Sequence, residues 1–203
     1  MNSFNYHHIL SLLVILGLSS CVVPESNHIA PDFYLLSQTQ TAELNNSKVS
    51  NHSFYMKEVE IPEFLNSSKM VSRPDKYSVE FRESKRWGEP LSDGIARVVS
   101  LNLANELNTN FFSIFPNRRE RELLWDIGLS VTDFGRIDLN KVRLAVLWEI
   151  QHSKEEFSRR GSYSLDLEID GNLTDSAQNE TRSLNKCLHR LSVELAEVIN
   201  GDF

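Results

Sequence analysis

The amino-acid sequence predicts an α+β fold: a single domain with a mostly antiparallel mixed sheet and two long helices packed on one face. Two segments repeat apolar residues every three or four positions, as helices with one buried face do. Other segments alternate apolar and polar residues, as strands with one buried face do. Two helices and seven or eight strand candidates are therefore expected to bury their apolar sides against each other, with both helices over one face of the sheet.

The first half of the domain, which we place at residues 32–203, contains short strands and one helix. The strand candidates are residues 32–37, 54–61, 70–73 and 77–82. One helical turn is expected over residues 62–65, with Pro62 at its first position. The helix begins at Pro90 and spans about 17 residues. Its apolar positions recur every fourth residue: Ile95, Val99, Leu103 and Leu107.

The second half contains longer strands and a second helix. The strand candidates are residues 111–115, 125–131, 142–150 and 163–169, of which the last two alternate most clearly. The polar residues 158–162, with Gly161, are expected to connect these two strands as a hairpin. The second helix begins at about Ser176 and ends before Gly201. Its single apolar stripe favours packing on the sheet over a coiled-coil seam.

The charge of the chain limits its partners. The sequence has 203 residues and a formal net charge of −7, and its first 20 residues contain no Asp, Glu, Lys or Arg. The following 183 residues, enough for one domain with a core, therefore carry all of that charge. An acidic domain has no electrostatic preference for nucleic acid or for an anionic membrane surface. Any attachment to a membrane must be covalent or apolar.

The amino terminus is typical of a bacterial lipoprotein precursor. Residues 9–18 form an apolar run that is too short to span a bilayer and suits the core of a signal peptide. Leu18, Ser19 and Ser20 precede Cys21, which is the pattern of a lipobox. We therefore predict a signal peptide over residues 1–20, cleavage between Ser20 and Cys21, and lipid attachment at the Cys21 thiol. The absence of Lys and Arg before the apolar run leaves an ordinary secretory signal as the alternative.

A short tether follows the predicted anchor. Residues 21–31 would link the lipid to the domain, and residues 22–31 reach at most about 33 Å when fully extended. Val22 follows the anchor where an Asp would resemble an inner-membrane retention signal, so we expect a location at the outer membrane, facing the periplasm. With Cys21 acylated, Cys187 has no intramolecular partner, and no disulfide is expected.

No sequence motif indicates catalysis. The chain lacks the common metalloprotease, thiol redox, nucleophile-elbow and phosphate-loop motifs, and its six His residues show no metal-ligand spacing. Cys187 lies on the apolar stripe of the second helix and is interpreted as a buried core residue. Glu155 and Glu156 adjoin basic residues and are interpreted as a solvated charged run. We expect no catalytic residue, no metal and no cofactor.

Four segments, taken with the lipobox, resemble a known family. They are Phe33–Leu36 (F-Y-L-L), Val59–Leu65 (V-E-I-P-E-F-L), Arg86–Leu91 (R-W-G-E-P-L) and Leu191–Ala196 (L-S-V-E-L-A). In order and spacing they resemble the ABC-type transport auxiliary lipoproteins, also called PqiC-like. The resemblance spans essentially the whole mature chain, with Gly88 and Leu195 as departures from the residues usual at those positions.

The resemblance implies a non-enzymatic outer-membrane lipoprotein that works with an ABC transporter and a periplasmic protein of the MCE type. Their joint task is to move lipids or other apolar molecules between membranes and to maintain envelope integrity. Whether this chain forms a homo-oligomer is left open by the sequence. Two other functions stay open: a factor that assembles or stabilises another outer-membrane complex, and, as the weaker alternative, a periplasmic hydrolase.

The junction between the fourth strand candidate and the first helix has two interpretations. Trp87 can fill the core where the strand ends, while Arg86 and Glu89 pair or cap the helix. Alternatively, Arg86, Trp87 and Glu89 form a contact for a partner protein. The same two interpretations apply to an aromatic cluster at Phe111, Phe112 and Phe115.

Overall fold

The computed structural model describes residues 30–39, 50–117, 123–154, 156–170 and 176–201. The predicted signal peptide, its cleavage point and Cys21 lie outside the described residues, as does most of the tether. Residues 31–203 form one unit, which contains every helix and strand described below. No helix in the described part of the chain is long and apolar enough to cross a bilayer.

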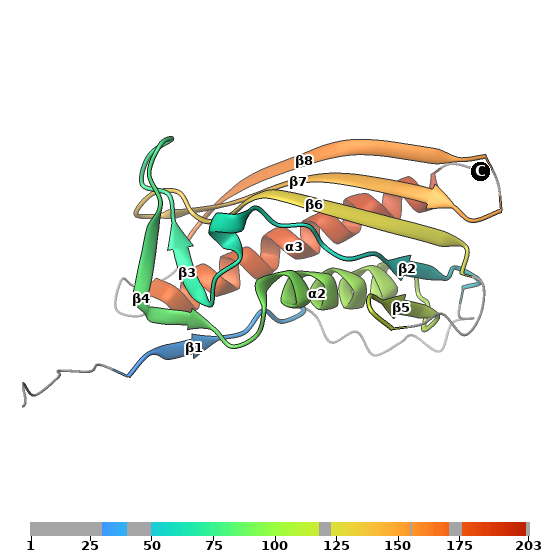
Figure 1. Ribbon diagram of the computed structural model, residues 1–203. Helices are drawn as coiled ribbons and strands as arrows, with labels where there is room; N and C mark the ends of the chain where they lie inside the picture. Colours follow the sequence, from blue (N-terminus) through green and yellow to red (C-terminus); the bar gives the residue numbers. More distant parts are fainter. Residues whose placement is uncertain (1–29, 40–49, 118–122, 155, 171–175, 202–203) are drawn as a thin grey trace, which may run out of the picture. The chain divides into compact units, whose positions relative to one another are not determined.

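The sheet is built around the long strand β6 (Trp125–Arg136), as Figure 1 shows. On one side, β6 pairs antiparallel with β7 (Lys141–His152), which pairs antiparallel with β8 (Ser158–Glu168). On the other side, the start of β6 pairs in parallel with β2 (Phe54–Met56). The last residue of β6 pairs with β3 (Lys69–Ser72). The two longest ladders of this mixed sheet are therefore antiparallel.

Three further strands extend the sheet beyond β2 and β3. The strand β5 (Phe112–Ile114) pairs in parallel with β2. Next to β3, β4 (Glu80–Trp87) pairs antiparallel, and β1 (Asp32–Tyr34) pairs in parallel with the end of β4. The result is an eight-stranded sheet in which β1 lies at an edge.

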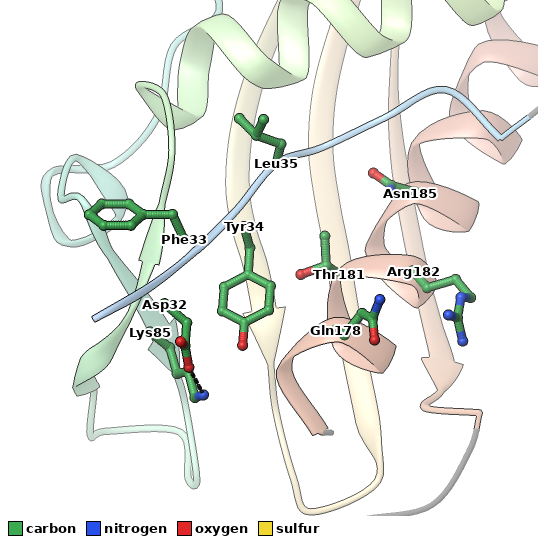
Figure 2. A pocket seen from close by; sticks show the side chains of 9 residues that line it. All are labelled: Asp32, Phe33, Tyr34, Leu35, Lys85, Gln178, Thr181, Arg182 and Asn185. Atoms are coloured by element: carbon green, nitrogen blue, oxygen red, sulfur yellow. Dashed lines mark hydrogen bonds and ion pairs between the residues drawn. The ribbon is translucent and has the colours of Figure 1, made fainter. Parts of the chain in front are cut away.

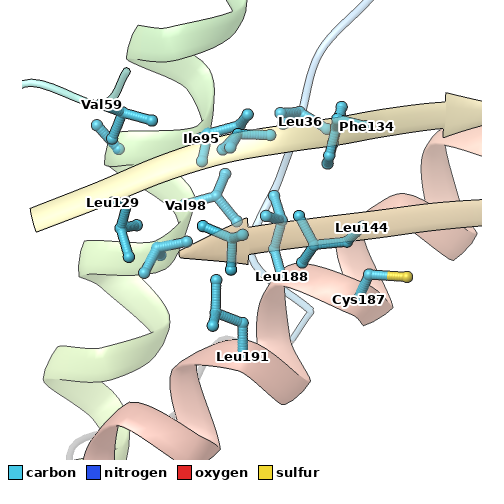
Figure 3. Close-up of a cluster of buried hydrophobic side chains, with 14 of the residues drawn as sticks. Leu36, Val59, Ile95, Val98, Leu129, Phe134, Leu144, Cys187, Leu188 and Leu191 are labelled. Carbon is cyan, nitrogen blue, oxygen red and sulfur yellow. The ribbon is translucent and has the colours of Figure 1, made fainter. Parts of the chain in front are cut away.

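Both long helices cover one face of this sheet (Figure 1). They are α2 (Leu91–Glu106) and α3 (Ser176–Asn200). Side chains from the two helices meet those of β6 and β7 in the core that Figure 3 shows, among them Val98, Leu129, Leu144, Leu188 and Leu191. The predicted α+β class is thus confirmed, and the stripe of α3 packs against the sheet and α2.

Helix boundaries follow local signals in the sequence. Pro90 precedes the first residue of α2, and Asn108, with φ of 49°, ends it in a left-handed conformation that Asn tolerates. At the contact between the helices, the Ser192 hydroxyl donates to the carbonyl oxygens of Leu188 and Val99, at 2.9 and 3.3 Å. A small hydroxyl at this contact lets the two helices approach closely while its hydrogen bonds are satisfied.

Three strand predictions in the first half are wrong in extent. The strand expected over residues 32–37 ends at Tyr34. The strand expected over residues 54–61 is limited to β2, although the Lys57 and Glu60 amides still donate to β6 carbonyl oxygens at 2.8 and 3.0 Å. The strand expected over residues 77–82 begins later and continues to Trp87. The second half of β4 is charged, so the sequence does not show it as a strand. In the structure, its charged side chains form ion pairs and its backbone pairs with β1.

The strand expected over residues 125–131 continues to Arg136 through an irregularity between Val131 and Asp133. Gly135 permits this extension, because its φ of 148° suits glycine and an added Cβ would lie 2.6 Å from the Val71 carbonyl oxygen.

The connection predicted over residues 158–162 is also wrong. These residues begin β8, and the turn lies before Ser158. One face of this strand is exposed to solvent, so its residues are polar. That polarity led to the prediction of a turn. Gly161 is required inside the strand, because it lies opposite the bulky Trp148 of β7.

Candidate functional site

The described domain begins at the edge of the sheet, directly after the predicted tether. Along β1, Asp32, Phe33 and Tyr34 pair in register with Lys85, Arg86 and Trp87 of β4. The Gly88 amide donates to the Tyr34 carbonyl oxygen at 2.8 Å, so that carbonyl points towards β4. Because backbone groups alternate sides along a strand, those of Phe33 point to the open side of β1.

Large apolar side chains are exposed at this edge. Phe33 is 64% exposed and Leu35 is 55% exposed, although most large apolar side chains in the described residues are buried. Leu36, one residue further along, is buried in the core. The chain therefore passes from an exposed apolar segment into the core within a few residues.

A cleft of about 750 Å³ lies between β1 and α3 (Figure 2). On the strand side, Lys85 donates to Asp32 at 2.6 Å and lies 5.7 Å from the centre of the Tyr34 ring. Hydrogen bonds to Asp32 and Tyr34 raise the pKa of Lys85. The ammonium group therefore stays charged at neutral pH and fixes the start of β1 to β4.

The helix side of the cleft is polar. It is lined by Gln178, Thr181, Arg182 and Asn185 of α3. The Asn185 side-chain oxygen accepts a hydrogen bond from the Ser37 amide at 3.0 Å, which fastens the chain after β1 to the helix. Arg182 is exposed and donates to Asn179 at 3.0 Å. The cleft thus holds two cations and one carboxylate on a chain whose net charge is −7.

The junction that follows β4 is held by polar contacts. Arg97 of α2 donates to both the Glu89 carboxylate and the Leu36 carbonyl oxygen, the latter at 2.9 Å. Glu89 therefore pairs with Arg97, and not with Arg86 as one interpretation of the sequence expected. Gly94 makes room for this pair, because an added Cβ would lie 2.9 Å from the Glu89 oxygen.

The remaining junction residues differ in accessibility. Trp87 is 6% exposed and packs on Phe134, with ring centroids 6.2 Å apart. Arg86 is half-buried, and its Nε donates to the Glu83 carbonyl oxygen at 3.5 Å. Arg86 and Glu89 thus retain accessible surface, whereas the Trp87 indole lies in the core. A partner contact through Arg86, Trp87 and Glu89 stays a prediction.

The aromatic cluster of Phe111, Phe112 and Phe115, at the opposite edge, also combines a packed side chain with accessible ones. Phe112 of β5 stacks on Phe54 of β2, with centroids 5.3 Å apart. Phe111 and Phe115 are each 46% exposed. The cluster therefore combines one ring packed on β2 with two rings at the surface.

Sequence reasoning missed a buried ionic cluster between α3 and the sheet. Glu180, with a side chain 1% exposed, accepts from Arg82 of β4 at 2.6 Å and from Arg136 of β6 at 2.9 Å. In the sequence, the signal for this cluster was one acidic residue, Glu180, near the apolar stripe of α3. The cluster joins the two halves of the sheet to α3, and nothing about it indicates a reaction.

Of the groups considered for catalysis, Glu155 lies outside the described residues, whereas Cys187 is described. Cys187 is fully buried, as the sequence predicted, and burial raises the pKa of its thiol to about 12. A thiol that stays protonated is a poor nucleophile. Within the described ranges, no three His, Cys, Asp or Glu side chains are grouped to hold a metal ion.

The sequence matches one protein family over most of its length. The model of the ABC-type transport auxiliary lipoprotein component matches residues 34–196. The chain belongs to this family. The ABC-type transport auxiliary lipoprotein match includes β1 from Tyr34, the junction and most of α3, so the resemblance drawn from the four sequence segments is confirmed.

Solved structures share the fold of this auxiliary lipoprotein. An uncharacterised protein superposes with a TM-score of 0.68 at 15% identity, covering 85% of this chain and 100% of that one. A DUF330-family protein from Xanthomonas campestris superposes with a TM-score of 0.61 at 10% identity, covering 84% and 92%. Among curated proteins, none matches the sequence.

Proposed function

We propose that this auxiliary lipoprotein is a non-enzymatic component, anchored in the outer membrane, of an MCE-type ABC system that moves lipids between membranes. The observation that carries the proposal is the family match over residues 34–196, which begins 13 residues after the lipobox cysteine Cys21. Cys21 carries the lipid after cleavage between Ser20 and Cys21, and the domain faces the periplasm. Loss of the protein would weaken the envelope.

The packing of the domain supports a role through its surface. Side chains of α2, α3, β6 and β7 fill the space between the helices and the sheet (Figure 3). Lipid is therefore not expected to pass between these layers. The domain instead serves as a docking point, and the partly exposed residues Arg86 and Glu89 near its amino-terminal edge are candidates for the contact.

The tether determines which protein must cross the periplasm. Residues 22–31 span at most about 33 Å, so the domain stays close to its own membrane. A periplasmic MCE protein must reach the lipoprotein there. A homo-oligomer of the lipoprotein would present several docking surfaces to one such partner.

Two measurements test the proposal. Labelled palmitate should enter the wild-type protein but not Cys21→Ser, and the wild-type protein should fractionate with the outer membrane. Purification of the tagged wild-type protein from mild detergent extracts should recover an MCE protein together with transporter subunits. Recovery of another outer-membrane assembly without MCE protein would overturn the transport role and favour the assembly-factor alternative.

A matched variant separates partner binding from folding. Arg86→Glu reverses a charge at the junction, whereas Arg190→Glu reverses an exposed charge on α3. If the junction contacts the partner, Arg86→Glu should recover less MCE protein than wild type, and Arg190→Glu should recover the wild-type amount. Equal recovery by both variants would remove Arg86 from the contact.

A further inference from the structure

We propose that the cleft between β1 and α3 faces the bilayer that holds the anchor and binds the phosphate of a zwitterionic phospholipid headgroup. The inference rests on the proposed function, because it requires a lipid at Cys21. It adds an orientation for the domain and a ligand for the cleft, neither of which follows from family membership.

The first argument is the position of β1 in the chain. Asp32 lies eleven residues after Cys21, a distance of at most about 40 Å in an extended chain. The anchor therefore keeps this edge of the sheet within reach of the membrane surface. Because β1 is the first strand of the domain, it is the element that the tether constrains most directly.

The second argument is the composition of the exposed edge. Phe33 and Leu35 are both more than half exposed, and Tyr34 and Lys85 lie beside them (Figure 2). Aromatic and aliphatic side chains combined with basic ones are characteristic of protein surfaces at the membrane interface. A contact with the headgroup region would cover the apolar side chains that the fold leaves in water.

The third argument is the chemistry of the cleft. Figure 2 shows Arg182 on the helix side and the Asp32–Lys85 pair on the strand side. An Arg guanidinium matches the geometry of a phosphate and holds it through two hydrogen bonds. Gln178 and Asn185 supply amide groups on the same side of the cleft. Its volume, about 750 Å³, lies in the range of small-molecule sites.

Charge favours a zwitterionic headgroup over an anionic one. The net charge of −7 opposes approach to an anionic surface, whereas a zwitterionic surface imposes no such penalty. The cleft holds groups of both signs, so Arg182 can take the phosphate while Asp32 lies near the ammonium group. Phosphoethanolamine combines these two charges in one headgroup.

The test uses the full lipidated protein reconstituted in phosphatidylethanolamine and phosphatidylcholine vesicles that contain a spin-labelled lipid. A fluorophore is attached at Phe33→Cys, or, as a control, at Leu147→Cys on β7, which does not line the cleft. Leu147 is 53% exposed, so the two positions are comparably accessible. We expect about twofold stronger quenching at position 33, because interfacial side chains enter the headgroup region by about 5–10 Å. Equal quenching at both positions would overturn the inference.

The headgroup is tested with a second set of variants. Arg182→Glu should reduce quenching at position 33 to the level of position 147, whereas Arg190→Glu on the same helix should leave it unchanged. Vesicles made from a glycolipid without phosphate should also lose the difference between the two positions. If the protein binds inorganic phosphate in solution while positions 33 and 147 are quenched equally on the vesicles, the cleft binds free phosphate and not the bilayer, and the inference is overturned.

Vesicle flotation separates this inference from the proposed function. A protein that does not float with the vesicles lacks its anchor, and both proposals then fail. A protein that floats but shows no difference between positions 33 and 147 retains the anchor and contradicts only the membrane orientation. Shielding of position 33 by an MCE protein in place of lipid would assign this edge to the partner and likewise overturn the inference.

Discussion

Gly161 of β8 lies directly opposite Trp148 of β7, and an added Cβ at position 161 would lie 2.4 Å from Cζ2 of the indole. The indole therefore covers the place where a side chain on β8 would begin. Trp148 is 8% exposed, so the ring that occupies this place is buried.

Gly161→Ala should destabilise the protein by about 2 kcal/mol, because the added methyl group must displace a ring held by the core. Denaturant unfolding followed by tryptophan fluorescence measures the change. A wild-type unfolding midpoint in Gly161→Ala would mean that the indole is free to move away, contrary to its buried position.

Gly88→Ala is the matched control and should change the stability by less than about 0.5 kcal/mol. Its Cβ would lie 3.0 Å from Cδ2 of Leu35, which is the end of a flexible, half-exposed side chain that can shift. The same denaturant titration tests it. A loss as large as that of Gly161→Ala would show that Leu35 is fixed in place at this edge.

Removal of the buried carboxylate of Glu180 should destabilise the protein strongly. Glu180→Ala leaves the Arg82 and Arg136 guanidinium groups without their shared acceptor, and breaking a buried ion pair in this way costs about 3 kcal/mol or more. Glu83→Ala, which removes an exposed carboxylate paired with Lys69, should leave the unfolding midpoint unchanged. Equal effects of the two variants would contradict a structural role for the buried cluster.

Cys187 should make the stability depend on alkaline pH. Burial raises the pKa of the folded thiol to about 12, whereas an unfolded thiol ionises near about pH 8.5. The unfolded state therefore loses the proton first, and stability should fall between about pH 9 and 12 by up to about 1.4 kcal/mol per pH unit. Cys187→Ala should remove this part of the slope.

The reactivity of the same thiol provides a direct check. In the folded protein at pH 8, Cys187 should resist alkylation by iodoacetamide, and it should react once the protein is unfolded in denaturant. Mass spectrometry of the alkylated chain measures both states. Rapid alkylation of the folded protein would contradict the burial of Cys187.

Several features could be predicted because they depend on local patterns. The spacing of Ile95, Val99 and Leu103 predicts α2, and the alternation from Val142 to Ile150 predicts β7, since each pattern places apolar side chains on one face. The burial of Cys187 follows from its place on the α3 stripe. The lipobox and each of the four family segments consist of consecutive residues, so they could be recognised without a structure.

The partners of each segment were decided only by tertiary structure. Arg82, Arg136 and Glu180 are far apart in sequence, and Glu180 is tolerated in the core because two strands bring guanidinium groups to it. From the sequence, Gly161 was interpreted as a turn residue. The structure shows that it lies within β8, opposite Trp148.

The sequence by itself determined the helices, the strongest strands, the family and the predicted anchor at Cys21. Tertiary structure decided that β1 forms an open edge beside a polar cleft, because that surface exists only where β1, β4 and α3 come together.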